Sequence, residues 1–270
     1  MPVVIILGLS SDIGRELAIR FDANNWSVWG THRNSAGLGK MSKRIKSVSC
    51  DLISAEGINH AVSAFQLENL RWDLLIIAAG TELPIGSFWD CDEDEWDSGI
   101  AINALAPLRF VRRIYSMRNQ SGAPSVAFFS GAGTNNAAPS YSAYSVSKIM
   151  LIKMCELLDT ESPDTSFFII GPGIVRTKIH QQTIDEPIRS GSNYQKVVKF
   201  LESDNLGTGH DEIFDCINWC LKSGKSIVGG RNISLVHDCW RNGGEVLAQK
   251  LSQNSEIYKL RRFGNDLQIN

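Results

Sequence analysis

The hydrophobic pattern opens with an apolar run, Val3–Leu7, in which no polar residue alternates with the apolar ones. Such a run is typical of a strand that is covered on both faces of a parallel sheet. A glycine-containing segment, 8–14, follows, and the residues from Arg15 to Phe21 have the spacing of an amphipathic helix. The beginning of the chain is therefore predicted to be a strand, a glycine turn and a helix.

The same alternation of strand and helix continues along the chain. Strands that are separated by helices pair in parallel through right-handed crossovers. We therefore predict the α/β fold class, with one Rossmann-like, doubly wound parallel sheet that has helices on both faces. The further predicted strands are 26–30, 48–50, 73–80, 125–129, 166–170 and 233–236, and the further helices are 55–68, 93–117 with an interruption at Pro107, 143–158 and 212–221.

Residues 178–206 differ in composition from the rest of the chain, because Gln, Ser, Asn and Gly mix there with short apolar runs. In an open α/β sheet, an excursion between a strand and a helix lies beyond the carboxyl ends of the strands, where ligands bind. We interpret this segment as a substrate loop that can act as a lid.

The charge and composition exclude some classes of partner. The chain has 27 Lys and Arg against 29 Asp and Glu among 270 residues, so it lacks the basic excess of a nucleic-acid-binding domain. No apolar run approaches the roughly 20 residues of a membrane-spanning helix, and the first residues lack the basic leader of a signal peptide. We expect no nucleic-acid partner, no membrane association and a cytoplasmic location.

Cysteine and histidine spacings do not indicate a metal site. The six cysteines form neither a CxxC pair nor a disulfide framework, so we expect reduced thiols. Cys216 and Cys220 share one helix face, but no His or second thiol pair accompanies them, and buried packing is the better interpretation. We therefore predict no metal.

The turn after the first strand has the character of a phosphate-binding site. Its glycines let backbone N–H groups and the helix N-terminus approach a pyrophosphate closely. The alternative is an ordinary strand-to-helix turn with Ser10 or Ser11 as N-cap. The candidate residues are Gly8, Ser10, Ser11, Ile13 and Gly14.

The sequence Tyr144-Ser145-Val146-Ser147-Lys148 carries the clearest chemical signal. In a helix, residues i and i+4 lie on one face, so the Lys148 ammonium can approach the Tyr144 phenol. A cation there favours the phenolate and lowers the pKa of the tyrosine toward the range that a general acid/base needs. In isolation the same pattern also fits a half-buried tyrosine with an exposed lysine.

In context, the chain resembles the short-chain dehydrogenase/reductase family of the YxxxK type over roughly residues 3–236. The motifs occur in the family's order along the sequence. They are the Gly8 to Gly14 turn, Asp51-Leu52, Ala78-Ala79-Gly80, Asn103, Ser130, Tyr144 with Lys148, and the turn Gly171-Pro172-Gly173-Ile174-Val175-Arg176-Thr177.

The resemblance implies a role for each matching residue. Tyr144 would exchange the proton, and Ser130 would polarise the substrate oxygen. Lys148 would tune the pKa of Tyr144 and hold the nicotinamide ribose. Asn103 would support a proton-relay water with Lys148. Asp51 and Leu52 would contact adenine, and Ala78, Ala79 and Gly80 would lie beside the adenosine ribose. Pro172 and Gly173 would form a turn from which Ile174 and Thr177 meet the nicotinamide carboxamide.

Three positions depart from the family's pattern. Asp12 stands where the family often has a second glycine, and Ala78 replaces an asparagine. More seriously, the family's serine position is Gly131, and Ser130 lies one residue earlier. A longer loop could present Ser130 correctly, Thr134 is a weaker substitute, and we interpret Ser142 as an N-cap.

The end of the second strand indicates which nucleotide is used. A site that prefers NAD needs a carboxylate there for the ribose hydroxyl groups, and no acid occurs between Trp26 and Ser35. Arg33 instead suits a 2′-phosphate, which favours NADP(H) over NAD(H). The alternative is that Arg33 is merely solvated or stacks on adenine, which leaves NAD usable.

The resulting prediction is an oxidoreductase that uses NAD(P)(H) to transfer a hydride between nicotinamide and a small-molecule carbonyl or alcohol substrate. We assign residues 1–236 to the dinucleotide-binding and catalytic domain and 237–270 to its C-terminal extension, with a helix at 245–251 and a basic, aromatic stretch at 258–263. The extension is expected to pack against the sheet edge or a neighbouring subunit, or else to cover the active site.

Two alternative functions fit parts of the sequence, and the family resemblance also implies an oligomeric state. One rival is a nucleotide-sensing regulatory protein that keeps the fold and has lost turnover, which the offset Ser130 suggests. The other is a sugar-nucleotide epimerase or dehydratase, which normally has a longer C-terminal region than this chain. The family resemblance further implies a homodimer or homotetramer that forms through the helices around Asn103 and Tyr144.

Overall fold

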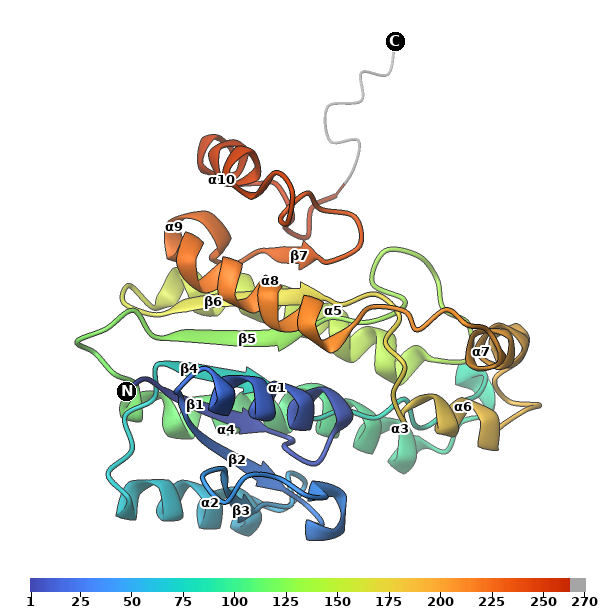
Figure 1. Ribbon diagram of the computed structural model, residues 1–270. Coiled ribbons are helices and arrows are strands. Elements are labelled where there is room, and N and C mark those ends of the chain that lie inside the picture. Colours follow the sequence, from blue (N-terminus) through green and yellow to red (C-terminus); the bar gives the residue numbers. More distant parts are fainter. Residues whose placement is uncertain (263–270) are drawn as a thin grey trace.

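A single sheet of seven parallel strands organises residues 1–262, which are the residues that the computed structural model describes (Figure 1). The strand order is β3-β2-β1-β4-β5-β6-β7, so the chain starts near the middle and winds outward in both directions. This confirms the predicted doubly wound α/β fold. The strands are β1 Val3–Leu7, β2 Ser27–His32, β3 Lys46–Ser49, β4 Leu74–Ile77, β5 Ser125–Phe129, β6 Ser166–Gly171 and β7 Asn232–Ser234.

Helices cover both faces of the sheet and create two hydrophobic cores. On one face, α1 and α8 bury Phe21 and Ile213 against the sheet. On the other face, α2, α4 and α5 bury Phe65, Phe110 and Leu151. This double burial explains why β1 and β4 are apolar throughout rather than alternating. The helices are α1 Asp12–Ala23, α2 Ala55–Leu67, α3 Glu93–Ile100, α4 Ala106–Ile114, α5 Ser142–Glu161, α6 His180–Asp185, α7 Ser192–Glu202, α8 His210–Ser223, α9 Lys225–Val228 and α10 Gly244–Gln253.

Several strand ends differ from the prediction. Val3–Leu7 and Ser125–Phe129 agree residue for residue, whereas β4 is shorter than 73–80. The last strand ends at Ser234 rather than at residue 236. There the Asp238 carboxylate accepts the N–H of Ser234 at 2.7 Å, which turns the chain away from the sheet.

The long helix predicted over 93–117 is interrupted before Pro107 rather than at it. Regular α-helix stops at Ile100, a π-helical turn spans Ala101–Leu105, and α4 then begins at Ala106. Pro107 lies in the first turn of α4, where a missing N–H costs little. The irregular turn carries Asn103, which accords with the frequent occurrence of π-turns at functional sites.

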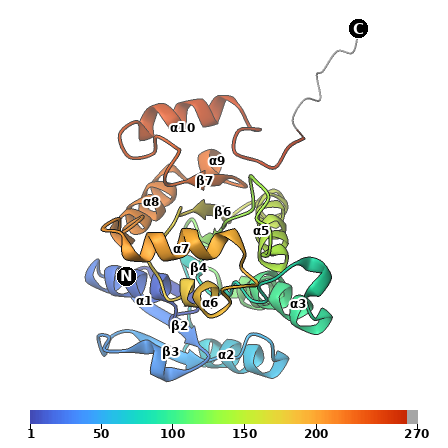
Figure 2. The same cartoon turned by 90° about the vertical axis from the view of Figure 1, so that its right-hand side faces the viewer.

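The segment 178–206 contains two helices, α6 and α7, which the loop prediction had missed. Both lie beyond the carboxyl ends of the strands, as Figure 2 shows when the sheet is viewed from that side. Arg176 fixes the end of α7, because its guanidinium donates to the carbonyl oxygens of Leu201, Phe200 and Ser203. The segment thus has the predicted place and more internal order than its composition indicated.

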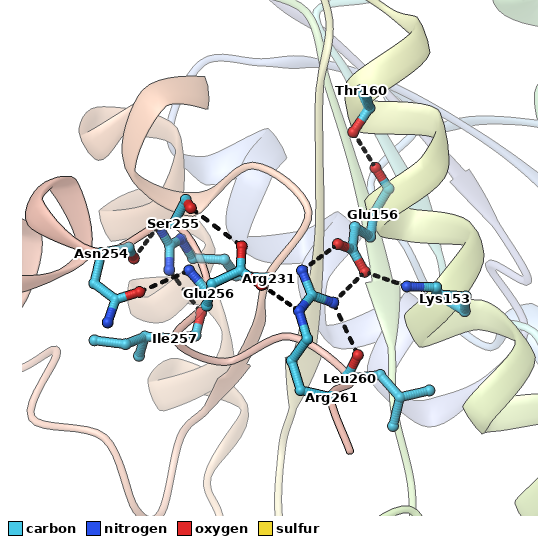
Figure 3. A network of polar contacts seen from close by, with 10 residues as sticks. All are labelled: Lys153, Glu156, Thr160, Arg231, Asn254, Ser255, Glu256, Ile257, Leu260 and Arg261. Carbon is cyan, nitrogen blue, oxygen red and sulfur yellow. Dashed lines mark hydrogen bonds and ion pairs between the residues drawn. The ribbon is translucent and has the colours of Figure 1, made fainter. Parts of the chain in front are cut away.

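The C-terminal extension packs on the outer edge of the sheet. The N–H of Asn232 in β7 donates to the carbonyl oxygen of Tyr258 at 2.8 Å. Arg231 is buried and donates to three carbonyl groups of the extension, those of Leu251, Asn254 and Ile257. Arg261 pairs with Glu156 of α5 (Figure 3). Residues 263–270, including the end of the predicted basic stretch, lie outside the described residues.

Replacing Arg231 should destabilise the fold more than replacing Arg261. Arg231→Met leaves buried carbonyl groups without donors, at a cost of about 3 kcal/mol in the free energy of unfolding. Arg261→Met removes two ion pairs, with Glu156 and Glu256, but the arginine side chain is 36% exposed, and the cost should stay below about 1 kcal/mol. Denaturant unfolding of both variants checks this, and equal losses would contradict the role we give to Arg231.

Candidate active site

The turn after β1 approaches the end of β4 so closely that it needs glycine. Gly8 has a φ of +90°, and a Cβ on it would lie 2.6 Å from the backbone nitrogen of Ala79. A Cβ on Gly14 would lie 2.3 Å from the carbonyl oxygen of Gly8. Ser11 is the N-cap of α1, since its hydroxyl accepts the N–H of Gly14 at 3.0 Å. The turn therefore offers open backbone at the N-terminus of α1.

A cavity of about 830 Å³ extends from this turn along the carboxyl ends of the central strands. Its volume falls in the range of small-molecule and cofactor sites. Many of the residues predicted to bind a dinucleotide line it, although they come from four separate loops. They are Gly8, Ser10, Ser11, Arg33, Asp51, Leu52, Ala79 and Gly80.

The other residues predicted to contact the cofactor surround this turn or lie on neighbouring loops. Ile13 packs against the core, and the N–H of Ala78 donates to Leu7. Gly173 has a φ of +74°, and a Cβ there would lie 2.5 Å from Val236. Pro172, Ile174 and Thr177 belong to the same loop after β6, and their contacts with nicotinamide stay predictions.

Asn103 connects the π-turn to the loop that follows β4. It is fully buried, its Oδ1 accepts the N–H of Thr81, and its Nδ2 donates to the carbonyl oxygen of Thr81, both at 2.8 Å. A Cβ on Gly80 would lie 3.2 Å from Asn103 Oδ1 and 3.9 Å from Lys148 Nζ. The structure therefore brings Gly80, Asn103 and Lys148 together, as the motif order implied.

Tyr144 and Lys148 share one face of α5, as their spacing predicted. Lys148 Nζ lies 5.5 Å from the centre of the Tyr144 ring and donates to the carbonyl oxygen of Phe129 at 3.1 Å. Burial lowers the pKa of Lys148 to about 8. Burial also raises the pKa of Tyr144, and the Glu82 charge raises it further. This direction is opposite to the one we expected, because loss of water around the phenol is its largest cause.

The hydroxyl groups of Ser130, Thr134 and Ser142 have different hydrogen-bond partners in the structure. A Cβ on Gly131 would lie 2.2 Å from the Tyr144 hydroxyl oxygen, so the backbone position that faces this hydroxyl carries no side chain. The Ser130 hydroxyl donates to Ile170 at 3.4 Å, and the Thr134 hydroxyl donates to Gly131. Ser142 is not the N-cap, which is Tyr141; its hydroxyl accepts the indole N–H of Trp96 instead.

Glu82 influences Tyr144 electrostatically, and no sequence pattern had indicated a chemical role for it. Its Oε2 accepts the hydroxyl of Thr183 at 3.0 Å, and that hydroxyl is 2.7 Å from the hydroxyl of Tyr141. Burial raises the pKa of Glu82 to about 7. Its position could have indicated a role, because Glu82 lies two residues after Gly80, in the loop after β4 that was predicted to border the cofactor.

Within residues 1–262, no group of three or more His, Cys, Asp and Glu could hold a metal ion. A search of the same residues for membrane-spanning helices finds none of sufficient length and apolar character.

Comparison with known families identifies the class of this arrangement. The sequence model of the short chain dehydrogenase family matches residues 2–187, which is more than half of the chain. The chain belongs to the short-chain dehydrogenase/reductase family of oxidoreductases.

Curated relatives match parts of the chain. Dehydrogenase/reductase SDR family member 4 of Homo sapiens is 27% identical over 107 residues, 39% of this chain and 38% of the relative. Short-chain dehydrogenase/reductase olcF of Penicillium canescens is 31% identical over 153 residues, 56% of this chain and 59% of the relative. The matched part thus spans less than two thirds of either relative.

Solved structures of the same fold cover most of the chain. A short-chain dehydrogenase/reductase from Saccharomyces cerevisiae has a TM-score of 0.77 at 20% identity, covering 92% of this chain and 99% of its own. The actinorhodin polyketide ketoreductase, crystallised with NADPH, has a TM-score of 0.74 at 16% identity, covering 86% and 95%. At these identities the likeness establishes the fold.

Glu82 should make stability depend on pH across the neutral range. Because its pKa in the fold, about 7, lies above its ordinary value, its contribution to stability is fully present below the ordinary pKa and is lost as pH rises through about 7. Between pH 5 and pH 8, the free energy of unfolding of the wild type should fall by about 2 to 3 kcal/mol relative to Glu82→Gln. Denaturant unfolding at both pH values measures this.

The control for this experiment is Glu93→Gln, which removes the same charge from an exposed position on α3. A constant difference between the wild type and Glu82→Gln at both pH values would show that the Glu82 carboxyl does not titrate near neutrality.

Proposed function

We propose that the protein is an NADP(H)-dependent oxidoreductase that reduces the carbonyl group of a small molecule, or oxidises the corresponding alcohol. The observation that carries the proposal is that Asn103 and Lys148 lie beside Gly80, which lines the cavity, and that Lys148 lies beside the Tyr144 ring. A phenol, an ammonium and a buried amide beside a dinucleotide-sized cavity suit proton transfer coupled to hydride transfer.

The chain's own residues supply binding and proton transfer. Gly8 and Gly14 allow the tight turn that leads into α1, and the N-terminus of α1 favours an anion such as a pyrophosphate through the helix dipole. When bound, the cofactor supplies the hydride. Tyr144 donates the proton to the reduced oxygen, and Lys148 provides a positive charge beside the phenol. Asn103 fixes the loop after β4 and lies, like Lys148, beside Gly80.

Ser130 is the hydroxyl that we propose to polarise the substrate oxygen. It lies two residues after Phe128, which packs in the core on the α5 side of the sheet. Because successive residues of a strand alternate between faces, Ser130 lies on the same side as α5 and Tyr144. Its present bond to Ile170 is long, at 3.4 Å, so a change of rotamer releases the hydroxyl at little cost.

Burial raises the pKa of Tyr144, so the phenol holds its proton at neutral pH. A general acid must be protonated before the reaction, and a phenol whose pKa is raised by burial is protonated at neutral pH. Alcohol oxidation instead needs the phenolate, so its rate should increase with pH over the range in which reduction stays constant.

The setting of Arg33 supports NADP(H) over NAD(H). Arg33 is exposed, lines the cavity at the end of β2, and has no acidic neighbour between Ser27 and Asn34. A guanidinium binds phosphate with two parallel hydrogen bonds, whereas a ribose hydroxyl favours a carboxylate. The ketoreductase of similar fold was crystallised with NADPH, which agrees with this assignment.

The substrate class and assembly follow the same proposal. The 178–206 segment combines Ile179 and Ile188 with Gln182 and Arg189, which suits a partly polar substrate of medium size. A homodimer or homotetramer through the helices around Asn103 and Tyr144 is the assembly we propose. All six cysteines are free thiols, in agreement with the cytoplasmic location that we propose.

A second candidate is a nucleotide-sensing regulatory protein with lost turnover. Gly131, the position facing the Tyr144 hydroxyl, lacks the side chain that could polarise a substrate. Tight NADPH binding without turnover on a panel of ketones, keto-acyl thioesters and keto-sugars would favour this candidate.

Tyr144→Phe tests the proposed mechanism. Removing the proton donor should lower kcat by about a hundredfold to ten-thousandfold, with the affinity for NADPH changed by less than about threefold. NADPH oxidation with a ketone that the wild type reduces provides the assay. Tyr141→Phe, which removes a hydroxyl bonded to Thr183, is the matched control and should retain most activity. Turnover near the wild-type rate in Tyr144→Phe would rule out the mechanism.

Arg33→Ala tests the choice of nucleotide. Loss of a charge-assisted contact with the 2′-phosphate should weaken NADPH binding by about tenfold to a hundredfold. NADH lacks this phosphate, so its affinity should be nearly unchanged. Fluorescence titration with both nucleotides measures the effect, and an equal loss for the two would show that Arg33 does not recognise the 2′-phosphate.

A further inference from the structure

Lys178 makes two hydrogen bonds to the glycine turn, although it lies far from this turn in the sequence. Its backbone N–H donates to Asp12 Oδ2 at 2.6 Å, and its ammonium donates to the carbonyl oxygen of Ser10 at 2.6 Å. The ammonium also lies 3.9 Å from Asp12 Oδ1. Asp12 is the first residue of α1, so the contact ties the segment after β6 to the helix that begins at the turn.

The Lys178 side chain lines the same cavity as Gly8, Ser10 and Ser11 and is 62% exposed. One ammonium hydrogen is directed to Ser10, and an ammonium has two more to donate. Two other basic residues line the cavity, Arg33 at the end of β2 and Arg189 near Gly86. Among the described basic residues that line the cavity, Lys178 is thus the one bonded to the glycine turn.

The negative charge of Asp12 explains why a cation is needed beside the glycine turn. A carboxylate at the first turn of α1 is favourable to the helix itself, but it repels an anion that approaches the same turn. The Lys178 ammonium, at 3.9 Å, offsets the carboxylate charge. The pair keeps the turn suitable for an anion although the position holds Asp12 rather than glycine.

We propose that Lys178 binds the diphosphate of the nicotinamide dinucleotide, and that Asp12 is a positioning residue which holds Lys178 at the glycine turn. The inference rests on the proposed function, because it concerns the same cavity. It adds to the predicted cofactor-binding residues a cation that the family motifs do not contain.

The same contact connects cofactor binding to the helix α6. Lys178 lies two residues before α6, and α6 is bonded at its other side to the loop after β4. There Gln182 Oε1 accepts the N–H of Glu82 at 2.7 Å, and the Thr183 hydroxyl donates to Glu82. A diphosphate held by Lys178 therefore strengthens one of the two attachments of α6 across the cavity.

The decisive experiment measures binding of three nucleotides to the full chain by calorimetry. NADPH and ADP-ribose contain the diphosphate, whereas 2′-AMP does not. Lys178→Met should weaken NADPH and ADP-ribose by about tenfold to a hundredfold and leave 2′-AMP within about twofold. The matched control is Lys199→Met, which removes the same charge from an exposed position in α7.

Asp12 is tested by the same measurement with two variants. Asp12→Gly removes the acceptor of the Lys178 N–H and should reproduce the selective loss of ADP-ribose and NADPH affinity. Asp12→Asn retains an oxygen acceptor at that place and should recover most of the affinity. If Asp12→Gly binds ADP-ribose as tightly as the wild type or more tightly, Asp12 does not position Lys178.

The outcomes separate this inference from the proposed function. Equal affinity of the wild type and Lys178→Met for ADP-ribose, with NADPH bound by both, would overturn the inference and leave the proposed function standing. An equal loss for 2′-AMP would also overturn it, because the lysine would then act on the whole site. A wild type that binds none of the three nucleotides would overturn both proposals.

Discussion

The close packing of the β1–α1 turn against the end of β4 is the contact on which the site depends. A side chain on Gly8 would meet the backbone of Ala79 at 2.6 Å, so only glycine lets these two strand ends approach each other. Gly80 directly follows Ala79 and lies next to Asn103 and Lys148. This steric requirement therefore holds the glycine turn next to the loop that carries Gly80, and both border the same cavity.

The fold, and the proximity of several candidate site residues, could be predicted from the sequence. The pKa shifts of these residues could not. Apolar periodicity reports burial on both faces of a sheet, so β1 and β5 could be placed residue for residue. The spacing of Tyr144 and Lys148 gave their shared helix face. The direction of the Tyr144 pKa could not be obtained in this way, because it depends on how completely the neighbouring segments exclude water. The side-chain direction at Gly131 and the contacts of Glu82 also depend on loop conformation, which local pattern does not define.

The site combines several ionisable groups whose charged forms burial disfavours. Lys148 has a lowered pKa, while the pKa values of Tyr144 and Glu82 are raised, all with burial as the largest cause. Each shift moves its group toward the neutral form near physiological pH. Outside this interior, Asp12 and Lys178 form an exposed charged pair at the glycine turn. Burial thus distinguishes the two regions, because the pKa values of the inner groups shift toward the neutral forms, whereas the Lys178 side chain at the glycine turn is 62% exposed.

Both margins of the sheet are closed to strand addition from another molecule. At one margin, the carbonyl oxygen of Tyr258 occupies the Asn232 N–H, which would otherwise be free to pair with a foreign strand. At the other, β3 is four residues long, and Lys46 carries a charge that pairs with Glu68. Short, charged or covered edges are the means by which sheets avoid open-ended association. The edges of this sheet therefore disfavour the open-ended growth of a continuous sheet from copies of this chain.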